Sequence, residues 1–130
     1  MPQMVRVALI YSSILGITGV IAGAVASHGL KSKTEEQRNA FMVGSNYQLL
    51  NSIAALGALA FSQAVKTTNP AAAKRSLIAS CLFLAGTTLF SGTIYARTFD
   101  APKALGKLAP MGGYLMMGGW SCLIAAALAL

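Results

Sequence analysis

The chain has 130 residues, of which 55% are hydrophobic and only 10% are charged. A soluble domain carries about 25% charged residues, so this composition excludes an ordinary soluble domain. The mean hydropathy of +0.63 also excludes a disordered chain. Ten Lys and Arg against three Asp and Glu give a net charge of +7. We expect a single integral membrane domain over residues 1–130.

Four apolar stretches are each long enough to cross a bilayer, which takes about 20 helical residues. They cover residues 7–26, 41–65, 76–96 and 110–130, and none contains a charged residue. Membrane-crossing strands need only about 10 residues of alternating hydrophobicity, so the length of these stretches favours helices. The predicted fold is all-α, an antiparallel bundle of four membrane-spanning helices joined by short loops.

The first connection carries two overlapping capping-box patterns, Ser32-x-x-Glu35 and Thr34-x-x-Gln37. In a capping box the hydroxyl and the Glu or Gln side chain satisfy two backbone N–H groups at a helix start. We therefore expect a short amphipathic helix at the membrane interface that starts here and runs into the second span.

Basic residues flank the spans on both sides of the membrane. An even number of spans places both termini on one side, with four basic residues there and six on the other. The positive-inside rule then places the first and third loops in the cytoplasm or matrix. We expect the six basic residues on that side to bind an anionic, cardiolipin-like phospholipid: Lys31, Lys33, Arg38, Arg97, Lys103 and Lys107. No run of five or more like charges occurs, so no nucleic-acid partner is predicted.

Polar side chains within the spans gather near that same membrane face. At membrane depth, such residues mark functional sites or hydrogen bonds between helices. The predicted polar cluster consists of His28, Tyr47, Gln48, Asn51, Ser91 and Tyr95. Tyr47 and Asn51 share a helix face at a spacing of four. We expect Gln48 and Asn51 to hydrogen-bond between helices, and His28 to be a hydrogen-bonding residue at the interface.

Residue types that commonly serve in catalysis are scarce in this sequence. The three acids, Glu35, Glu36 and Asp100, lie between spans, so no intramembrane carboxylate pair is available for acid–base chemistry. One histidine cannot complete a zinc site or a bis-histidine haem site. We expect no catalytic residue, no metal site and no cofactor, and therefore a protein that is not an enzyme.

Small residues recur at every fourth position in three spans, and paired glycines occur in the fourth. They are Gly19, Gly23 and Ser27; Ala54, Ala58 and Ser62; Thr88, Gly92 and Ala96; and Gly112, Gly113, Gly118 and Gly119. Such stripes let helices approach closely in lipid, within one chain or against another membrane subunit. Trp120 falls in the middle of a span and is expected to pack inside the bundle, and Cys81 and Cys122 are expected to be buried thiols.

Several of these segments carry a family resemblance. They are Ala26-Ser27-His28-Gly29-Leu30-Lys31, Tyr47-Gln48, Leu89-Phe90-Ser91-Gly92-Thr93-Ile94-Tyr95, Leu108-Ala109-Pro110-Met111-Gly112-Gly113 and Gly119-Trp120. Over nearly the whole chain it resembles the transmembrane protein 256 family, small four-helix membrane proteins of bacteria and mitochondria with no assigned reaction. Lys107-Leu108-Ala109-Pro110 is more similar to the mitochondrial branch. A histidine that commonly follows the Tyr-Gln pair is Asn51 here, so the resemblance does not imply a two-histidine site.

Two hypotheses of function follow. The first is a non-catalytic accessory subunit of a larger, respiratory-type inner-membrane complex, which contacts other membrane subunits and binds anionic lipid. The alternative is a small solute or ion transporter or channel that uses the polar cluster near His28 and Asn51. The resemblance implies the mitochondrial inner membrane as the location, with a bacterial plasma membrane as the alternative.

Overall fold

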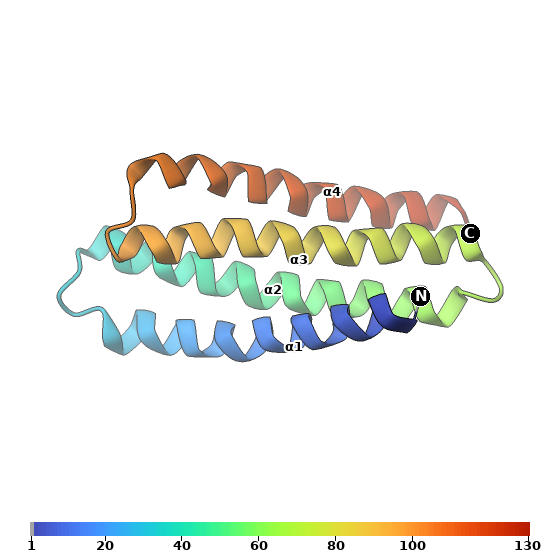
Figure 1. Cartoon of the computed structure of the whole chain (residues 1–130), viewed down its shortest axis with the longest axis horizontal. Helices are drawn as coiled ribbons and strands as arrows, with labels where there is room; N and C mark the ends of the chain where they lie inside the picture. Colours follow the sequence, from blue (N-terminus) through green and yellow to red (C-terminus); the bar gives the residue numbers. More distant parts are fainter. Residues whose placement is uncertain (1) are drawn as a thin grey trace.

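The computed structural model describes residues 2–130, which form four long helices and no strand. The helices are α1 (Pro2–Ala24), α2 (Glu35–Val65), α3 (Pro70–Thr98) and α4 (Leu108–Leu128). Successive helices run antiparallel, and the first and third loops lie at the end opposite the termini (Figure 1). All four helices are long and apolar enough to cross a membrane. The predicted all-α fold with four spanning helices is confirmed.

The helices are longer than the predicted spans. α2 has 31 residues and α3 has 29, so each is about 45 Å long at 1.5 Å per residue. The hydrocarbon core is only about 30 Å thick, so their ends reach the headgroup region. A π-helical turn (Val25–Gly29) extends α1, and a 3-10 turn (Lys103–Lys107) leads into α4.

α2 starts with one of the two predicted capping boxes. The Thr34 hydroxyl accepts a hydrogen bond from the Gln37 N–H (3.1 Å), and the Gln37 side chain accepts one from the Thr34 N–H (3.0 Å). The overlapping pattern at Ser32 and Glu35 does not form. The predicted amphipathic segment is therefore the first part of an uninterrupted α2 and not a separate helix.

Replacing Thr34 by alanine is expected to lower the free energy of unfolding by about 1 kcal/mol, because the backbone N–H of Gln37 loses its hydrogen-bond acceptor. Ser32→Ala is the matched control and is expected to leave stability unchanged. Thermal unfolding of the purified protein, followed by circular dichroism in detergent, measures both. Equal losses in the two variants would contradict the assignment of the cap.

α3 ends in a Schellman motif that fixes the position of its last turn. Asp100 adopts a positive φ of 66°, and the Ala101 N–H donates to the Ala96 carbonyl (3.1 Å). The Asp100 N–H donates to the carbonyl of Arg97 (3.3 Å). These two bonds satisfy carbonyls that a helix end leaves free. Arg97 is thereby held on the last turn of α3, beside the third loop.

Buried serine hydroxyls join α2 to α3 along their whole length. The donors and their accepting carbonyls are Ser62 to Ala73 (2.7 Å), Ser76 to Ala58 (2.7 Å), Ser80 to Ala55 (2.9 Å) and Ser91 to Gly44 (2.7 Å). All four serines are buried. We call this row the serine seam. Polar contacts of this kind contribute about 0.6 kcal/mol each in a membrane, and the small side chains bring the helices close together.

α3 and α4 meet at a contact between glycines. A Cβ built on Gly112 would lie 2.6 Å from the carbonyl oxygen of Gly86 and 2.5 Å from the backbone nitrogen of Phe90. A Cβ on Gly119 would lie 2.8 Å from the ring of Phe83. Only glycine fits at these positions, which agrees with the close approach expected of the fourth span. Gly113, next in sequence, faces open space.

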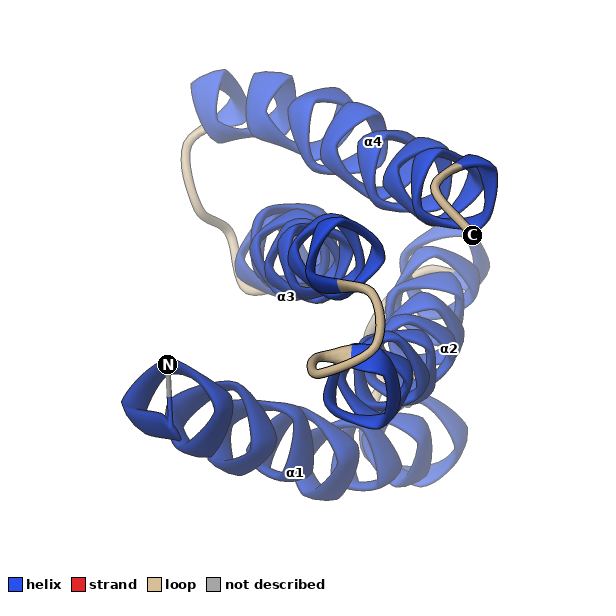
Figure 2. Ribbon diagram, turned by 90° about the vertical axis from the view of Figure 1, so that its right-hand side faces the viewer, coloured by secondary structure: helices blue, strands red, loops and turns tan. Residues whose placement is uncertain are grey.

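The four helices do not close into a four-sided bundle. Among the described long helices, α4 packs extensively against α3 alone, and α1 packs mainly against α2. Viewed end-on, α3 occupies the centre, with α1 and α4 on opposite sides of it (Figure 2). In the most apolar part of each helix, half of the α3 residues are buried, compared with 22% in both α1 and α4. The outer helices therefore present most of their surface to the membrane.

Candidate functional site

The predicted polar cluster is not one site, because its members lie on different faces of the helices. Gln48, Ser91 and Tyr95 line a shallow cavity between α1, α2 and α3. Tyr47 and Asn51 line a groove on the other side of α2, facing α4. His28 is exposed in the turn that extends α1, and its side chain makes no hydrogen bond to a described residue. The structure shows no hydrogen bond from His28 within residues 2–130, and its expected role at the interface stays a prediction.

Gln48 connects three helices. Its amide nitrogen donates to the Leu15 carbonyl (2.8 Å) and to the Thr18 hydroxyl (2.7 Å), both on α1. Its amide oxygen accepts from the Tyr95 hydroxyl on α3 (2.6 Å). The side chain is only 3% exposed. The prediction that Gln48 bonds between helices is confirmed, and both of its amide N–H groups are already used in bonds to α1.

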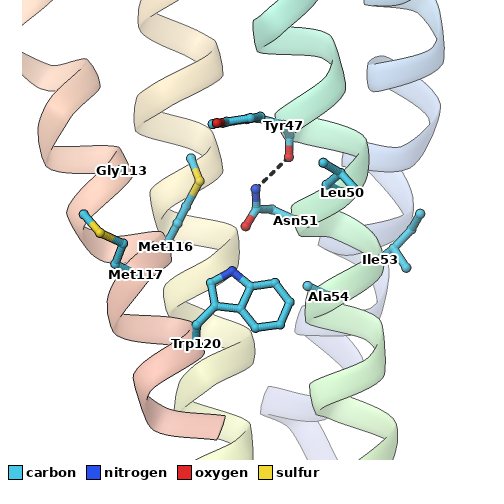
Figure 3. A pocket seen from close by; sticks show the side chains of 9 residues that line it. All are labelled: Tyr47, Leu50, Asn51, Ile53, Ala54, Gly113, Met116, Met117 and Trp120. Carbon is cyan, nitrogen blue, oxygen red and sulfur yellow. Dashed lines mark hydrogen bonds between the residues drawn. The ribbon is translucent and has the colours of Figure 1, made fainter. Parts of the chain in front are cut away.

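Asn51 differs from Gln48, and the prediction that it bonds between helices is wrong. Its amide nitrogen donates to the Tyr47 carbonyl (2.8 Å), one turn earlier in the same helix. Its amide oxygen accepts no hydrogen bond from a described residue, although the side chain is only 7% exposed. Figure 3 shows this oxygen directed away from the Tyr47 carbonyl, toward the space between α2 and α4.

That space is a groove of about 600 Å³ at membrane depth, which we call the α2–α4 groove. It is lined by Tyr47, Leu50, Asn51, Ile53, Ala54, Gly113, Met116, Met117 and Trp120. Trp120 is 54% exposed here, with its ring against that of Phe83 (centroids 4.9 Å apart, planes at 68°). The expectation that Trp120 packs inside the bundle is wrong, because the open arrangement leaves this face of α4 uncovered. Tyr47 stacks on Phe90 at the same groove (4.9 Å).

The six predicted lipid-binding residues lie at the end of the molecule formed by the first and third loops, which we call the basic end (Figure 1). Two of them form contacts within the protein, and Lys33 connects the first loop to the third. The Lys33 ammonium lies 3.9 Å from the Asp100 carboxylate and 5.6 Å from the centre of the Phe99 ring. The Arg38 guanidinium donates to the carbonyl of Lys33. Lys33 and Arg38 are therefore partly engaged within the protein.

Arg97 is the basic residue best placed to meet a ligand. It lines a cavity of about 280 Å³ between α2, α3 and the third loop, with its guanidinium packed over Gly106. Glu36 lines the same cavity, but Lys33–Asp100 is the only ion pair within residues 2–130. Lys103 and Lys107 are exposed on the adjoining turn, and Lys31 is exposed on the first loop.

The cysteines and other metal-ligating side chains form no centre. Cys81 is exposed on the membrane-facing surface of α3, so the expected burial of this thiol is wrong, and Cys122 is partly buried. Within the described part of the chain, no three His, Cys, Asp or Glu side chains come together in a way that could hold a metal ion.

Comparison with known sequences places these features in a family. The family model described as "Protein of unknown function (DUF423)" matches residues 22–113. The chain belongs to the DUF423 family. The matched range includes the capped start of α2, the serine seam and the glycine contact between α3 and α4. The resemblance inferred from the motifs is consistent with membership of DUF423.

Relatives of this DUF423 protein occur in bacteria and yeast. A UPF0382 membrane protein of Haemophilus influenzae is 32% identical over 114 residues, covering 85% of this chain and 86% of the relative. A UPF0382 membrane protein of Schizosaccharomyces pombe is 27% identical over 120 residues, with coverage of 87% and 94%. The Escherichia coli UPF0382 inner membrane protein YgdD is 29% identical over 128 residues, with coverage of 96% and 92%. No solved structure matches the chain significantly. The protein is an integral membrane protein of an uncharacterised family.

Proposed function

We propose that this DUF423 protein is a non-catalytic accessory subunit that binds anionic phospholipid within a larger, respiratory-type complex. Its location in this proposal is the mitochondrial inner membrane, as the resemblance of Lys107-Leu108-Ala109-Pro110 implies, with a bacterial plasma membrane as the alternative. The observation that carries the proposal is the half-buried guanidinium of Arg97, which faces a cavity at headgroup depth and forms no ion pair with a described residue.

A phosphate group suits this cavity chemically. A guanidinium binds phosphate through two parallel N–H···O bonds, and such charge-assisted bonds are about twice as strong as neutral ones. Lys103 and Lys107 on the adjoining turn add two exposed cations beside Arg97. A headgroup with two phosphates, as in cardiolipin, would engage Arg97 with one phosphate and these lysines with the other.

The outer helices support the role of a subunit. α1 and α4 present rows of apolar side chains outward, and Gly16 and Gly113 have no heavy atom of another residue near the position that a Cβ would take. Small residues with open space around them allow a helix from another subunit to approach closely.

The transporter alternative would require polar groups that are free to line a wet path. Gln48 and the serine seam instead use their polar groups in hydrogen bonds to neighbouring helices. No observation favours transport, so it is not part of the proposal.

Lipid retention tests the proposed binding. The triple variant Arg97→Gln, Lys103→Gln, Lys107→Gln is expected to copurify with at least about tenfold less anionic phospholipid, because each Lys or Arg near an anionic surface contributes about 1 kcal/mol. The matched control is Lys66→Gln with Lys74→Gln, at the opposite end of the molecule. Mass spectrometry of lipid extracted from the purified proteins gives the measurement. Equal retention in the two variants would contradict lipid binding at the basic end.

Extraction of native membranes in mild detergent, followed by native-gel separation, tests the role of a subunit. We expect the protein to migrate with a large complex at a fixed stoichiometry. Migration as a free monomer that still carries anionic lipid would contradict the subunit role and leave the lipid site intact.

A further inference from the structure

The α2–α4 groove contains a hydrogen-bond acceptor that nothing in the described protein satisfies. Asn51 lies close to the midpoint of the 31-residue α2, and therefore near the middle of the bilayer. Its side chain is 93% buried, its amide nitrogen is bonded to the Tyr47 carbonyl, and its amide oxygen faces the groove (Figure 3). Water is scarce at this depth, so an unpaired polar atom there is costly. A ligand that carries a hydrogen-bond donor would remove this cost.

A donor faces the same groove from the opposite helix. The indole of Trp120 on α4 lines the groove, and its Nε1–H donates to no described residue. In Figure 3 the nitrogen edge of the indole is turned toward the side of the groove where the Asn51 amide oxygen lies. The groove therefore offers one acceptor and one donor to an occupant, within walls that are otherwise apolar.

The size and the lining of the groove favour a flat aromatic headgroup. A volume of about 600 Å³ is in the range of sites for small organic molecules, roughly 300–1,000 Å³. The rings of Tyr47 and Trp120 and the sulfur of Met116 are groups that pack well against an aromatic ring. Leu50 and Ile53 line the groove and are more than half exposed, so it opens sideways into the lipid, where a long apolar tail would lie.

We propose that the α2–α4 groove binds a lipid-soluble hydroquinone. One hydroxyl of the hydroquinone donates to the Asn51 amide oxygen, and a hydroquinone oxygen accepts from the Trp120 Nε1–H. The ring packs between Tyr47, Met116 and Trp120, and the tail extends into the bilayer. This site is separate from the basic end, and it does not depend on the binding of phospholipid there.

The chain has a single tryptophan, so its fluorescence reports directly on the groove. The full-length protein is placed in phosphatidylcholine nanodiscs and titrated anaerobically with decylhydroquinone and, separately, with the dimethyl ether of the same compound. The ether has the same ring and tail but cannot donate a hydrogen bond. We expect a saturable change in tryptophan fluorescence with the hydroquinone. The ether is expected to bind about tenfold more weakly, which is the effect of one hydrogen bond.

Two substitutions test whether Asn51 is the residue that makes the hydroquinone bind more tightly than its ether. Asn51→Leu removes the acceptor and is expected to bind the hydroquinone and the ether equally. The matched control is Asn46→Leu, an exposed position on α2 outside the groove, which is expected to retain the tenfold preference. If Asn51→Leu does not fold, the comparison of the two ligands on the unaltered chain still decides the question.

Three outcomes would overturn the proposal. The first is a fluorescence change that does not saturate with either ligand. The second is equal affinity for the hydroquinone and its ether in the unaltered chain, which would indicate a groove for acyl chains. The third is a stable dimer in sedimentation that buries Trp120, which would show that a second copy of the chain occupies the groove.

Discussion

Replacing Gly112 by alanine is expected to lower the free energy of unfolding by about 2–3 kcal/mol, near the upper end of the usual cost of overpacking. The added methyl group would lie 2.5 Å from the Phe90 nitrogen and 2.6 Å from the Gly86 oxygen. Both are backbone atoms of α3, so no side-chain rotation relieves the clash and the two helices must separate. Since α4 packs extensively against α3 alone among the long helices, no second helix offers α4 a comparable packing surface to compensate.

Gly113→Ala is the matched control, one residue away in the same helix. No atom lies within 4 Å of its added methyl group. Alanine is a better helix former than glycine by about 0.5–1 kcal/mol, so this variant is expected to be as stable as the parent or more stable. Circular dichroism during thermal unfolding in detergent gives the comparison. Similar behaviour of the two variants would mean that α3 and α4 do not meet at Gly112.

Gln48→Leu is expected to destabilise the protein by about 2 kcal/mol. It removes three interhelical hydrogen bonds, each worth about 0.6 kcal/mol in a membrane, and leaves the half-buried Tyr95 hydroxyl without its acceptor. Because two of the three hydrogen bonds reach α1, the substitution is expected mainly to weaken the packing of α1 against α2. Accessibility of single cysteines introduced along α1 is expected to increase in this variant.

Asn51→Leu provides the contrast on the same helix. Its side chain bonds only within α2 and its amide oxygen has no partner, so its replacement by leucine is expected to leave the free energy of unfolding unchanged or to raise it. Thermal unfolding of both variants under the same conditions measures the difference. If Asn51→Leu lost as much stability as Gln48→Leu, Asn51 would have a structural role that its observed contacts do not show.

The sequence predicted the number, order and approximate limits of the helices because an apolar stretch in lipid has few alternatives to a helix. It also predicted the capped start of α2 and the close packing of Gly112. It did not predict how each helix is rotated about its axis. Topology placed Gln48 and Asn51 at a similar depth. They lie about 60° apart around the axis of α2, however, so Gln48 points toward α1 and α3 and Asn51 points toward α4.

The serine seam and the exposure of Trp120 could not be predicted from the apolar pattern of the helices alone. The serine seam has a signal in the sequence, Ser76 and Ser80 at a spacing of four, but serine is common in membrane helices and its partners are backbone carbonyls. The burial expected of Trp120 assumed a closed bundle. With α4 packed on α3 alone, the centre of a span is no longer the centre of the protein.

The packing order of the helices bears on how the protein assembles. Each helix packs chiefly against the helix that precedes or follows it in the chain, so a newly inserted helix finds its partner already in the membrane. Little chain entropy is lost in bringing such neighbours together, because the connections are short. α1 and α2 can pair before α3 is complete, and α4 adds last, onto the surface that α3 already presents.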